Sequence, residues 1–478
     1  MRNTTIKLFA GERVLVVGMG RYPLGSSMSA VRFFLRQGAR VTVTDDKPRR
    51  SLAAGLRLLR GLPVRLVLGR YRTEDFRRAD IVFHNQIVRV PPRFRNAMRP
   101  AAALMSEIDL FMSLYSGKAI GITGTRGKST TTSLVGAMFR AAHRPALVGG
   151  NIKISPLSFI EKARRATAPV ILELSSWQLE GFVRSPRPLE TVVITNIFPD
   201  HLNTYPSMAA YVNAKANIFR RQGKHDAAVI SRDNAAARIL GSRVLGRRFW
   251  FSKKSFPTEN GSFVRAGKIS FRENGKTSVV ARVSDVRYLI GEHNLENVLA
   301  AVTVAKIHGL SNAAVVKTLR TFRGLPDRLE FVRSVGGVRF YNDTTATSPD
   351  GAIAGLAALA GSTKSQVSSS NRTVLIAGGT DKKLEFGDFA KAIKKYAKSL
   401  VLIDGTATER LVWELKQIKY PIDTIPIVKE MKLAVTLARE KSKKGDTVLL
   451  SPGAASFGIF ANEFDRGEQF VKVVRKLK

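Results

Sequence analysis

The sequence predicts an α/β protein of three domains, each built on a mostly parallel β-sheet with flanking helices. Its 478 residues are too many for one ordinary domain and suffice for about three, each with its own core. Short apolar runs alternate with segments of helical periodicity along the chain, and this alternation is typical of parallel sheets covered by helices. Hydrophobic residues make up 44% of the chain, a content that argues against general disorder.

The first segment has the pattern of a nucleotide-binding half. The strand RVLVVGMG leads into the turn Gly18-Met19-Gly20, a helix around SSMSAVRFFLRQG, and a second strand, ARVTVTDD, that ends in two acids. This order is a βαβ unit, which binds nucleotides at its strand ends. Gly25 lies too far along the chain to complete the usual dinucleotide fingerprint. We therefore predict a Rossmann-like, nucleotide-binding domain over residues 1–116.

A phosphate cradle opens the second segment. Residues 120–139, IGITGTRGKSTTTSLVGAMF, place a glycine-rich turn between an apolar strand and a helix. Glycines let a backbone approach phosphate oxygens, and a helix N-terminus directs free N–H groups at them. Lys128 would neutralise the β- and γ-phosphates and Ser129 would hold magnesium, although the spacing is shorter than the common G-x-x-x-x-G-K-[ST] pattern. A surface turn merely rich in Gly, Ser and Thr is the alternative, and the flanking strand and helix argue against it.

Strands and helices continue to alternate to the end of the chain. After the cradle come the strands PVILELSS, TVVITNIFP and HDAAVIS and a stretch with two Asn-Gly turn signals that predicts a β-hairpin region, all within a P-loop ATPase domain over residues 117–322. From GLPDRLE onward, strands at GVRFYND, RTVLIAGG, SLVLID and DTVLLSPG predict a Rossmann-like C-terminal domain over residues 323–478. The stretch GSTKSQVSSSNR predicts a mobile loop.

Three polar residues follow the cradle at positions suited to metal-assisted phosphoryl transfer. Glu173 ends the run PVILEL, His201 follows the strand TVVITNIF, and Lys215 lies on the next helix. Singly, each has a plain interpretation, as a charge at a helix start, a turn histidine and a surface lysine. Their joint occurrence after a phosphate cradle favours the functional interpretation.

Charge is the unusual feature of the composition. There are 78 Lys and Arg residues against 37 Asp and Glu, a formal net charge of +41, which raises the question of a nucleic-acid partner. The basic residues are spread over the whole chain, with no basic tail and no RNA-binding signature. We therefore favour a solvated basic surface and expect no specific nucleic acid.

Cysteine is absent, which excludes disulfides and any thiolate nucleophile or metal ligand. No apolar run approaches the length of a membrane span. We expect a cytoplasmic protein without membrane insertion.

The order of motifs resembles the Mur ligases of peptidoglycan synthesis, and most closely the branch that adds D-glutamate. The resemblance covers nearly the whole chain. It rests on GTRGKST in the cradle, ELSSWQLE (173–180), GEHNLENVLAA (291–301), GLPDRLE (324–330), YNDTTATSPD (341–350) and LLSPGAASFGIFANEFDRGEQF (449–470). Related ligases and folylpolyglutamate synthases share the cradle, whereas the SSWQLE segment and the LSPGAAS terminus point to this branch.

The resemblance implies three roles for the three domains. The N-terminal domain would hold the UDP part of UDP-N-acetylmuramoyl-L-alanine, the central domain would bind ATP, and the C-terminal domain would receive D-glutamate. The precursor carboxylate would attack the γ-phosphorus of ATP, and the amine of D-glutamate would then displace phosphate from the acyl phosphate. Closure of the C-terminal domain over ATP and a monomeric enzyme are further expectations.

The same resemblance assigns individual residues. Lys128, His201, Lys215 and Arg328 would be catalytic, with two Mg²⁺ ions on Ser129, Glu173, His201 and a Lys215 carboxylated by CO₂. ATP would contact Gly124, Thr125, Gly127, Lys128, Ser129, Thr130, Asn294 near the adenine, Arg328 at the γ-phosphate and Asp343 at the ribose. The precursor would contact Asp45, Asn151, Ser175 and Gln178, and D-glutamate would contact Lys382 and Ser456.

Several positions depart from the family pattern and leave alternatives open. Thr345 stands where a lysine is common, and Lys382 and Lys383 are both candidates for the glutamate carboxylate. The segment HNQIVRV lacks a glycine usual at the uracil contact, and Asp45 is the residue expected to make that contact. A related ligase for another amino acid, such as L-glutamate, a nucleic-acid-binding ATPase and an inactive scaffold are the competing hypotheses.

Overall fold

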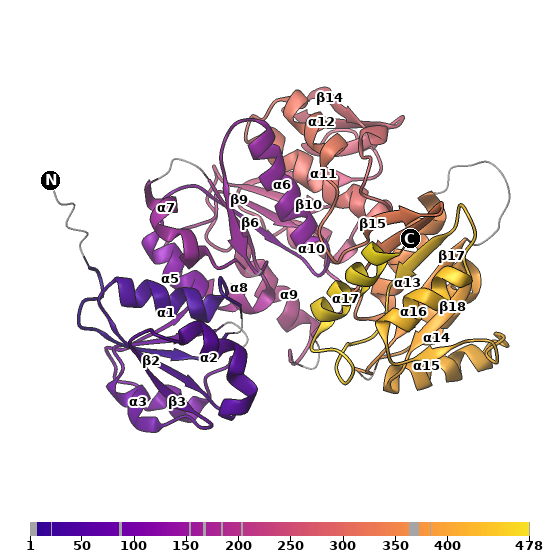
Figure 1. The fold of residues 1–478 in the computed structure, drawn as a ribbon. Helices are drawn as coiled ribbons and strands as arrows, with labels where there is room; N and C mark the ends of the chain where they lie inside the picture. The colour runs from indigo at the N-terminus through magenta and orange to yellow at the C-terminus, as the bar shows by residue number, and fades with distance from the viewer. Residues whose placement is uncertain are drawn as a thin grey trace. The chain divides into compact units, whose positions relative to one another are not determined.

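Three sheets flanked by helices make up the protein (Figure 1). The computed structural model describes residues 7–20, 22–85, 88–152, 154–165, 169–182, 185–201, 204–362, 372–382 and 384–477. Most neighbouring strands run parallel, which confirms the predicted α/β class. Contacts group the chain into one unit of Met1–Val283 with Glu296–Thr318 and a second of Ser284–Leu295 with Leu319–Lys478. The predicted domain limits at residues 116 and 322 stay predictions.

The N-terminal sheet has five parallel strands in the order β3-β2-β1-β4-β5. Its strands are β1 Arg13–Val17, β2 Arg40–Asp45, β3 Val64–Leu68, β4 Ile81–His84 and β5 Ala103–Ser106. Its helices are α1 Ser26–Arg36, η1 Arg49–Leu52, α2 Ala53–Leu59, α3 Thr73–Arg78, α4 Pro92–Asn96 and α5 Glu107–Leu114. Consecutive β1, α1 and β2 form the predicted βαβ unit.

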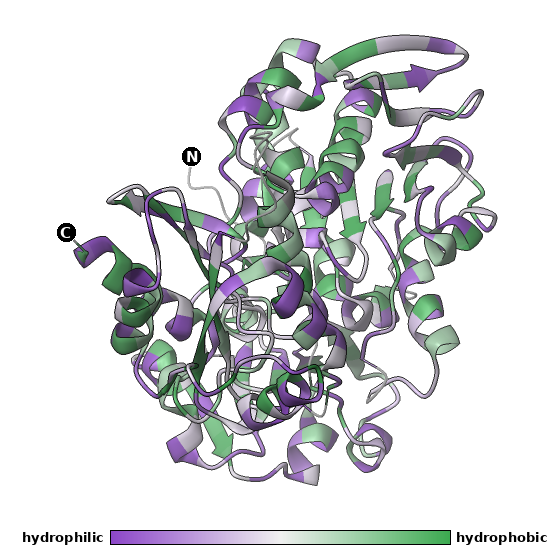
Figure 2. Ribbon diagram, turned by 90° about the vertical axis from the view of Figure 1, so that its right-hand side faces the viewer, coloured by the Kyte–Doolittle hydropathy of each residue, from purple (hydrophilic) through white to green (hydrophobic). Residues whose placement is uncertain are grey.

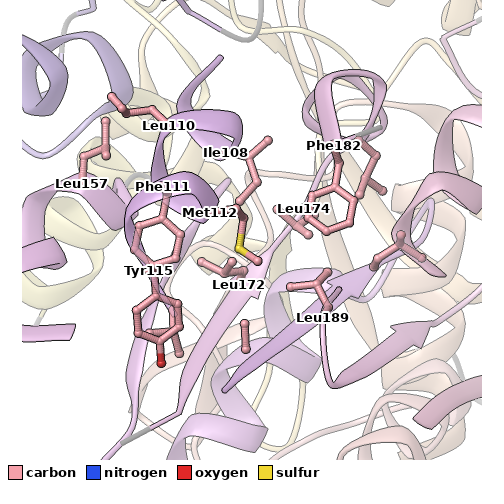
Figure 3. Close-up of a cluster of buried hydrophobic side chains, with 14 of the residues drawn as sticks. Ile108, Leu110, Phe111, Met112, Tyr115, Leu157, Leu172, Leu174, Phe182 and Leu189 are labelled. Atoms are coloured by element: carbon pink, nitrogen blue, oxygen red, sulfur yellow. The ribbon is translucent and has the colours of Figure 1, made fainter. Parts of the chain in front are cut away.

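Helix α5 of the N-terminal part packs against the hydrophobic core of the central sheet. Ile108, Leu110, Phe111 and Met112 are buried in the same hydrophobic cluster as strand residues of the central sheet. Figure 3 shows these side chains beside Leu172, Leu174, Phe182 and Leu189. Burial of large apolar side chains is the main favourable term in folding, so α5 joins the N-terminal and central parts of the first unit.

The central sheet has nine strands in the order β14-β13-β12-β11-β10-β9-β6-β8-β7. Its strands are β6 Ala119–Thr123, β7 Leu147–Gly150, β8 Val170–Glu173, β9 Thr191–Ile194, β10 Ala227–Ser231, β11 Arg247–Ser252, β12 Gly261–Arg265, β13 Lys268–Glu273 and β14 Lys276–Arg282. The helices of this part are α6 Lys128–Ala141, η2 Pro156–Phe159, α7 Ile160–Arg165, α8 Ser176–Phe182, α9 Met208–Ala216, η3 Asn217–Phe219, α10 Ala235–Gly241, η4 Val283–Asp285, α11 Glu292–Ile307 and α12 Asn312–Thr321.

Only one of the two Asn-Gly signals in the predicted hairpin region makes a hairpin turn. Asn274-Gly275 connects β13 to β14, and both residues have positive φ as a two-residue turn of type I′ requires. Asn260-Gly261 instead leads into β12, which pairs in parallel with β11. The other tight turn, between β12 and β13, is formed by Ala266-Gly267. Strand pairing with β11, which local turn chemistry does not encode, accounts for the difference.

The C-terminal sheet has six strands in the order β15-β16-β20-β17-β18-β19, parallel except for the β15–β16 pair. Its strands are β15 Glu330–Val335, β16 Val338–Asn342, β17 Thr373–Gly378, β18 Ala397–Ile403, β19 Ile427–Val428 and β20 Thr447–Leu450. Its helices are α13 Pro349–Ser362, α14 Gly387–Tyr396, α15 Thr406–Gln417, α16 Met431–Glu440 and α17 Glu463–Lys476. The predicted loop GSTKSQVSSSNR begins inside α13, and its residues 363–371 lie outside the described part of the chain.

Hydrophobic and hydrophilic residues alternate along the helices that flank the sheets (Figure 2). This pattern is that of amphipathic helices that bury one face. Among the described helices, none combines the length and the apolar character needed to cross a membrane.

Candidate active site

The cradle forms a tight loop between β6 and α6. Gly124 has φ 149° and Gly127 has φ 80°, both in the region that favours glycine. A Cβ at Gly124 would collide with the Thr195 hydroxyl, and one at Gly127 with the Asn297 amide. The next strand end holds the loop, because Asn196 accepts from the Thr125 and Arg126 amides, each at 2.9 Å. The loop therefore has the shape that the glycine spacing predicts.

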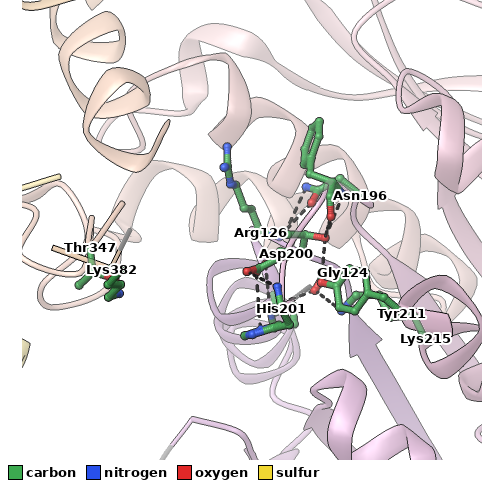
Figure 4. A network of polar contacts seen from close by, with 12 residues as sticks. Gly124, Arg126, Asn196, Asp200, His201, Tyr211, Lys215, Thr347 and Lys382 are labelled. Atoms are coloured by element: carbon green, nitrogen blue, oxygen red, sulfur yellow. Dashed lines mark hydrogen bonds and ion pairs between the residues drawn. The ribbon is translucent and has the colours of Figure 1, made fainter. Parts of the chain in front are cut away.

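Two lysines converge on one carbonyl of this loop. Lys128 Nζ donates to Gly124 O at 3.0 Å and to Thr125 O at 2.9 Å. Lys215 Nζ donates to the same Gly124 O at 2.8 Å, and Figure 4 shows these two residues. Lys215 is only 2% exposed and lies 4.6 Å from the centre of the Tyr211 ring. Burial lowers the pKa of Lys215 well below its ordinary value, the Lys128 charge lowers it further, and Asp200 opposes both.

Glu173 ends β8 with one oxygen unpaired. It is 1% exposed; Oε1 accepts from Asn151 Nδ2 at 3.1 Å, and Oε2 is buried with no hydrogen-bond partner among the described residues. A buried carboxylate oxygen without a donor is costly unless a cation fills the gap. Glu173 thus has the chemistry of a Mg²⁺ ligand.

His201 lies on a strained turn after β9. Its φ is 55°, and its backbone amide donates to Asp200 Oδ1 at 2.9 Å (Figure 4). Its ring centre lies 4.6 Å from that of Trp177. In the described part of the chain, no three His, Asp or Glu side chains gather closely enough to hold a metal ion by themselves. A magnesium site here would therefore need further oxygen donors, such as the Ser129 hydroxyl.

The predicted precursor residues Ser175 and Gln178 bind each other. Gln178 Oε1 accepts from the Ser175 backbone N–H at 3.0 Å and from the Ser175 hydroxyl at 3.1 Å. The Gln178 backbone N–H donates to Ser175 Oγ at 3.3 Å. Asp45 lies at the end of β2, and both of its carboxylate oxygens accept hydrogen bonds from backbone N–H groups, of Met19 at 2.7 Å and of Lys47 at 3.0 Å. Asp45 thus shapes the glycine turn after β1.

In the second unit, Asp343 follows β16 and is 9% exposed. Its oxygens accept from the Ser451 hydroxyl at 2.8 Å and from the Leu329 amide at 3.1 Å. Burial raises the pKa of Asp343 to about 7, and these two hydrogen bonds and the Arg328 charge oppose the rise. Arg328 itself is exposed.

The other predicted residues of this unit have different surroundings. Asn294 Nδ2 donates to Ile290 O at 2.8 Å, and the exposed Lys382 donates to Thr347 Oγ1 at 2.9 Å. Ser456 Oγ is buried with no partner among the described residues. Thr345, which replaces the common lysine, donates to Asp327 O at 2.8 Å. The alternative carboxylate partner, Lys383, lies outside the described residues.

Comparisons with known proteins agree over the whole chain. Two family models, described as Mur ligase middle domain and as Mur ligase, glutamate ligase domain, match residues 122–305 and 327–453. A UDP-N-acetylmuramoylalanine-D-glutamate ligase of Roseiflexus sp. (strain RS-1) is 40% identical over 475 residues, 97% of this chain and 98% of that protein. The chain belongs to the Mur ligase family.

Other relatives support the same membership. The ligase of the same name from Caldanaerobacter subterraneus subsp. tengcongensis is 37% identical over 98% of this chain and 99% of its own length. Among solved structures, the UDP-N-acetylmuramate-alanine ligase of Thermotoga maritima has a TM-score of 0.61 at 20% identity, covering 97% of this chain and 99% of that one. The likeness shows that the fold is the three-domain fold of Mur ligases. Mur ligases depend on ATP and use Mg²⁺.

One buried residue of this Mur ligase was not predicted as part of the site. Arg466 on α17 is 0% exposed and donates to Thr344 Oγ1 at 3.0 Å, Thr344 O at 2.9 Å, Ala454 O at 3.2 Å and Ala455 O at 3.3 Å. It thereby joins the loop after Asp343 to the loop that carries Ser456. Its sequence signal is an arginine on the same helical stripe as the buried Phe470 and Val474.

Proposed function

We propose that this chain is an ATP-dependent ligase that forms an amide bond between UDP-N-acetylmuramoyl-L-alanine and D-glutamate, in peptidoglycan precursor synthesis. The observation that carries the reaction class is the cradle with Lys128 and Lys215 on one carbonyl, in the same unit as the unpaired oxygen of Glu173. The full-length similarity to ligases named for D-glutamate supports the choice of amino acid.

In the proposed reaction, the terminal carboxylate of the precursor attacks the γ-phosphorus of ATP. ADP leaves, and the precursor becomes an acyl phosphate. The amine of D-glutamate then attacks the acyl carbon, phosphate leaves, and the amine loses a proton. Both steps bring anions together, so positive groups must stabilise the charge that develops.

Chain groups supply that stabilisation and the positioning. Gly124, Thr125, Gly127 and Thr130 would surround the ATP phosphates with loop and helix N–H groups, and Lys128 would leave the loop carbonyls to pair with the β- and γ-phosphates. Magnesium, held as two ions by Ser129, Glu173, His201 and a modified Lys215, would neutralise phosphate charge when bound. Holding the carboxylate in line with the γ-phosphorus accounts for much of the remaining rate enhancement.

Carboxylation of Lys215 would complete this ligand set. The free amine adds to CO₂, the new N–C bond forms, one proton is released, and a cation becomes an anionic oxygen ligand. Burial and the neighbouring Lys128 favour the free amine that this reaction needs. Among the described residues no three His, Asp or Glu side chains gather closely enough to hold a metal ion, so an anionic oxygen on Lys215 would add a ligand to the set.

The remaining assignments divide between precursor, nucleotide and amino acid. Asp45, Asn151, Ser175 and Gln178 are proposed for the precursor, and Asn294, Arg328 and Asp343 for the adenosine and γ-phosphate of ATP. Lys382 and Ser456 are proposed for D-glutamate, and the buried unpaired hydroxyl of Ser456 supports a ligand there. Because the last five belong to the second unit, closure of that unit on ATP is proposed before turnover. We also propose that the enzyme acts as a monomer in the cytoplasm, where ATP is available.

Phosphate release from ATP and Mg²⁺ tests the function. The purified protein is given the precursor together with D-glutamate, L-glutamate, D-lysine or single-stranded nucleic acid in turn. Release that requires both the precursor and D-glutamate is the expected result. Release with another amino acid would move the specificity to a different Mur ligase reaction, and stimulation by nucleic acid alone would overturn the assignment.

A further inference from the structure

A buried acid on α5 takes no part in the proposed chemistry. Glu107, the first residue of α5, is 2% exposed. Its Oε2 accepts from Gln178 Nε2 at 3.4 Å, and its Oε1 is buried with no partner among the described residues. Burying a carboxyl group in this way carries a free-energy cost, so a neutral or apolar side chain here would favour stability.

The helix does not need Glu107 as a cap. Ser106 caps α5 by accepting from the Asp109 amide, and the Asp109 carboxylate accepts from the Ser106 amide at 3.0 Å, which completes a capping box. The apolar face of α5, shown in Figure 3, accounts for its packing in the core. Since neither the capping nor the packing of α5 requires Glu107, the free-energy cost of burying its carboxyl group points to a function outside α5.

The neighbours of Glu107 come from three other segments. Gln178 lies on α8, Ser26 is the first residue of α1, and Ser155 precedes η2. Burial raises the pKa of Glu107 to about 7, and the side chains of Ser155, Ser26 and Gln178 oppose this rise. The Ser155 amide also donates to Leu24 O, in the same turn as Ser26, at 2.7 Å. Glu107 thus lies between the start of α1 and the Ser175–Gln178 segment.

The contact with Gln178 has a chemical consequence for Ser175. Gln178 presents its side-chain NH₂ group to Glu107 Oε2 and its Oε1 to Ser175, whose backbone N–H and hydroxyl both donate to that oxygen. The Ser175 hydroxyl therefore donates its only hydrogen bond to Gln178 Oε1. Toward a ligand it can only accept, which suits an amide N–H or hydroxyl of the precursor.

We propose that Glu107 is a positioning residue for the nucleotide precursor: it fixes the side-chain amide of Gln178, and through it the hydroxyl of Ser175, near the start of α1. This inference rests on the proposed function, in which Ser175 and Gln178 contact the precursor. Glu107 itself touches no reacting atom, so its loss weakens binding of the precursor and leaves the chemical step intact.

Steady-state kinetics of Glu107→Leu test the inference. We expect the KM for the precursor to rise about tenfold, because Gln178 loses its acceptor, while kcat and the KM for ATP stay within about twofold. Glu107→Gln keeps an acceptor for Gln178 and is expected to restore the wild-type KM. Glu107→Asp, which is shorter by one methylene and disturbs the core less, should raise the KM about threefold.

A matched control separates positioning from general loosening of the fold. Glu161 Oε1 accepts from the side-chain NH₂ group of Gln37, also at 3.4 Å. This hydrogen bond likewise links the N-terminal part of the chain to the central part, but away from the Ser175–Gln178 segment. Glu161→Leu should leave the KM for the precursor unchanged. An equal rise in Glu161→Leu, or an unchanged KM in both Glu107→Leu and Glu107→Asp, would overturn the inference.

Calorimetric binding of the precursor to the same variants needs no turnover. A wild-type protein that binds the precursor but forms no product counts against the proposed function alone, and the affinities of the Glu107 variants still decide the inference. Weaker binding in Glu107→Leu than in Glu161→Leu is the expected result. A wild-type protein that does not bind the precursor overturns both proposals.

Discussion

Lys128 and Lys215 donate to the same acceptor, the carbonyl oxygen of Gly124, at 3.0 and 2.8 Å. Burial lowers the pKa of Lys215 well below its ordinary value, and repulsion by the Lys128 ammonium group lowers it further. The phosphate-binding lysine therefore influences the chemistry of the lysine that is proposed to become a metal ligand.

Removing the Lys128 charge is expected to raise the pKa of Lys215. Lys128→Met leaves the burial that is the main cause of the lowered pKa, so the pKa rises but stays below its ordinary value of 10.5. Since only the free amine adds CO₂, the pH at which a ¹³C-labelled carbamate signal reaches half its height in NMR should rise equally. Exposed Lys224 offers the control Lys224→Met, and an unshifted profile in Lys128→Met would contradict the coupling.

Glu173→Gln is expected to weaken magnesium binding. The substitution keeps the acceptor for Asn151 but removes the charge next to the unpaired oxygen. The Mg²⁺ concentration for half-maximal phosphate release should rise by about 10- to 100-fold. Glu190 also has an unpaired buried oxygen but pairs with Lys118, so Glu190→Gln is the control and should not change the Mg²⁺ dependence. Equal dependence in wild type and Glu173→Gln would exclude Glu173 as a ligand.

Asp343 should make the protein less stable as the pH rises. Its folded pKa of about 7 exceeds the ordinary 3.8, so between these values the folded state binds more protons than the unfolded state. Stability therefore falls with pH across this window, by about 4 kcal/mol as an upper bound. Asp343→Asn cannot titrate, and its thermal midpoint should fall less than that of wild type between pH 4 and pH 8. Parallel declines would show that Asp343 is ionised throughout.

Arg466→Leu should destabilise the C-terminal sheet and impair use of the amino acid. The change leaves the carbonyl groups of Thr344 and Ala454 without their donor and removes one of the two donors of Ala455 O, at a cost of about 3 kcal/mol. Because these residues neighbour Asp343 and Ser456, the KM for D-glutamate should also rise. Exposed Arg475 on the same helix gives the control Arg475→Leu. Wild-type stability and a wild-type KM for D-glutamate in Arg466→Leu would show that Arg466 supports neither the sheet nor the amino-acid site.

The cradle could be predicted from sequence because its chemistry is local. A strand, two glycines, a lysine and a helix start follow one another within a few residues, and each contributes through its own backbone or side chain. Glu173 and His201 could be located because polar residues at the ends of parallel strands gather at one edge of a sheet. Their proposed roles stay predictions until ligands are measured.

Features that depend on partners distant in sequence could not be predicted. Arg466 bonds to Thr344, 122 residues away, and Glu107 meets Gln178, 71 residues away. The Asn260-Gly261 signal failed as a turn for the same reason, since pairing between β11 and β12 decides that backbone. Asp45 has a structural role that was not predicted from the sequence, since its oxygens accept two backbone N–H groups, and its contact with the precursor stays a proposal.

The most direct test of the proposed ligase reaction follows an oxygen atom from the precursor carboxylate to the released phosphate. The precursor is prepared with ¹⁸O in its terminal carboxylate, and the protein is given ATP, Mg²⁺ and D-glutamate. An acyl phosphate transfers one carboxylate oxygen to phosphorus, so mass spectrometry should find one ¹⁸O in each released phosphate and D-glutamate in the product. Release of unlabelled phosphate would mean that water attacks ATP and would contradict the proposed ligase reaction.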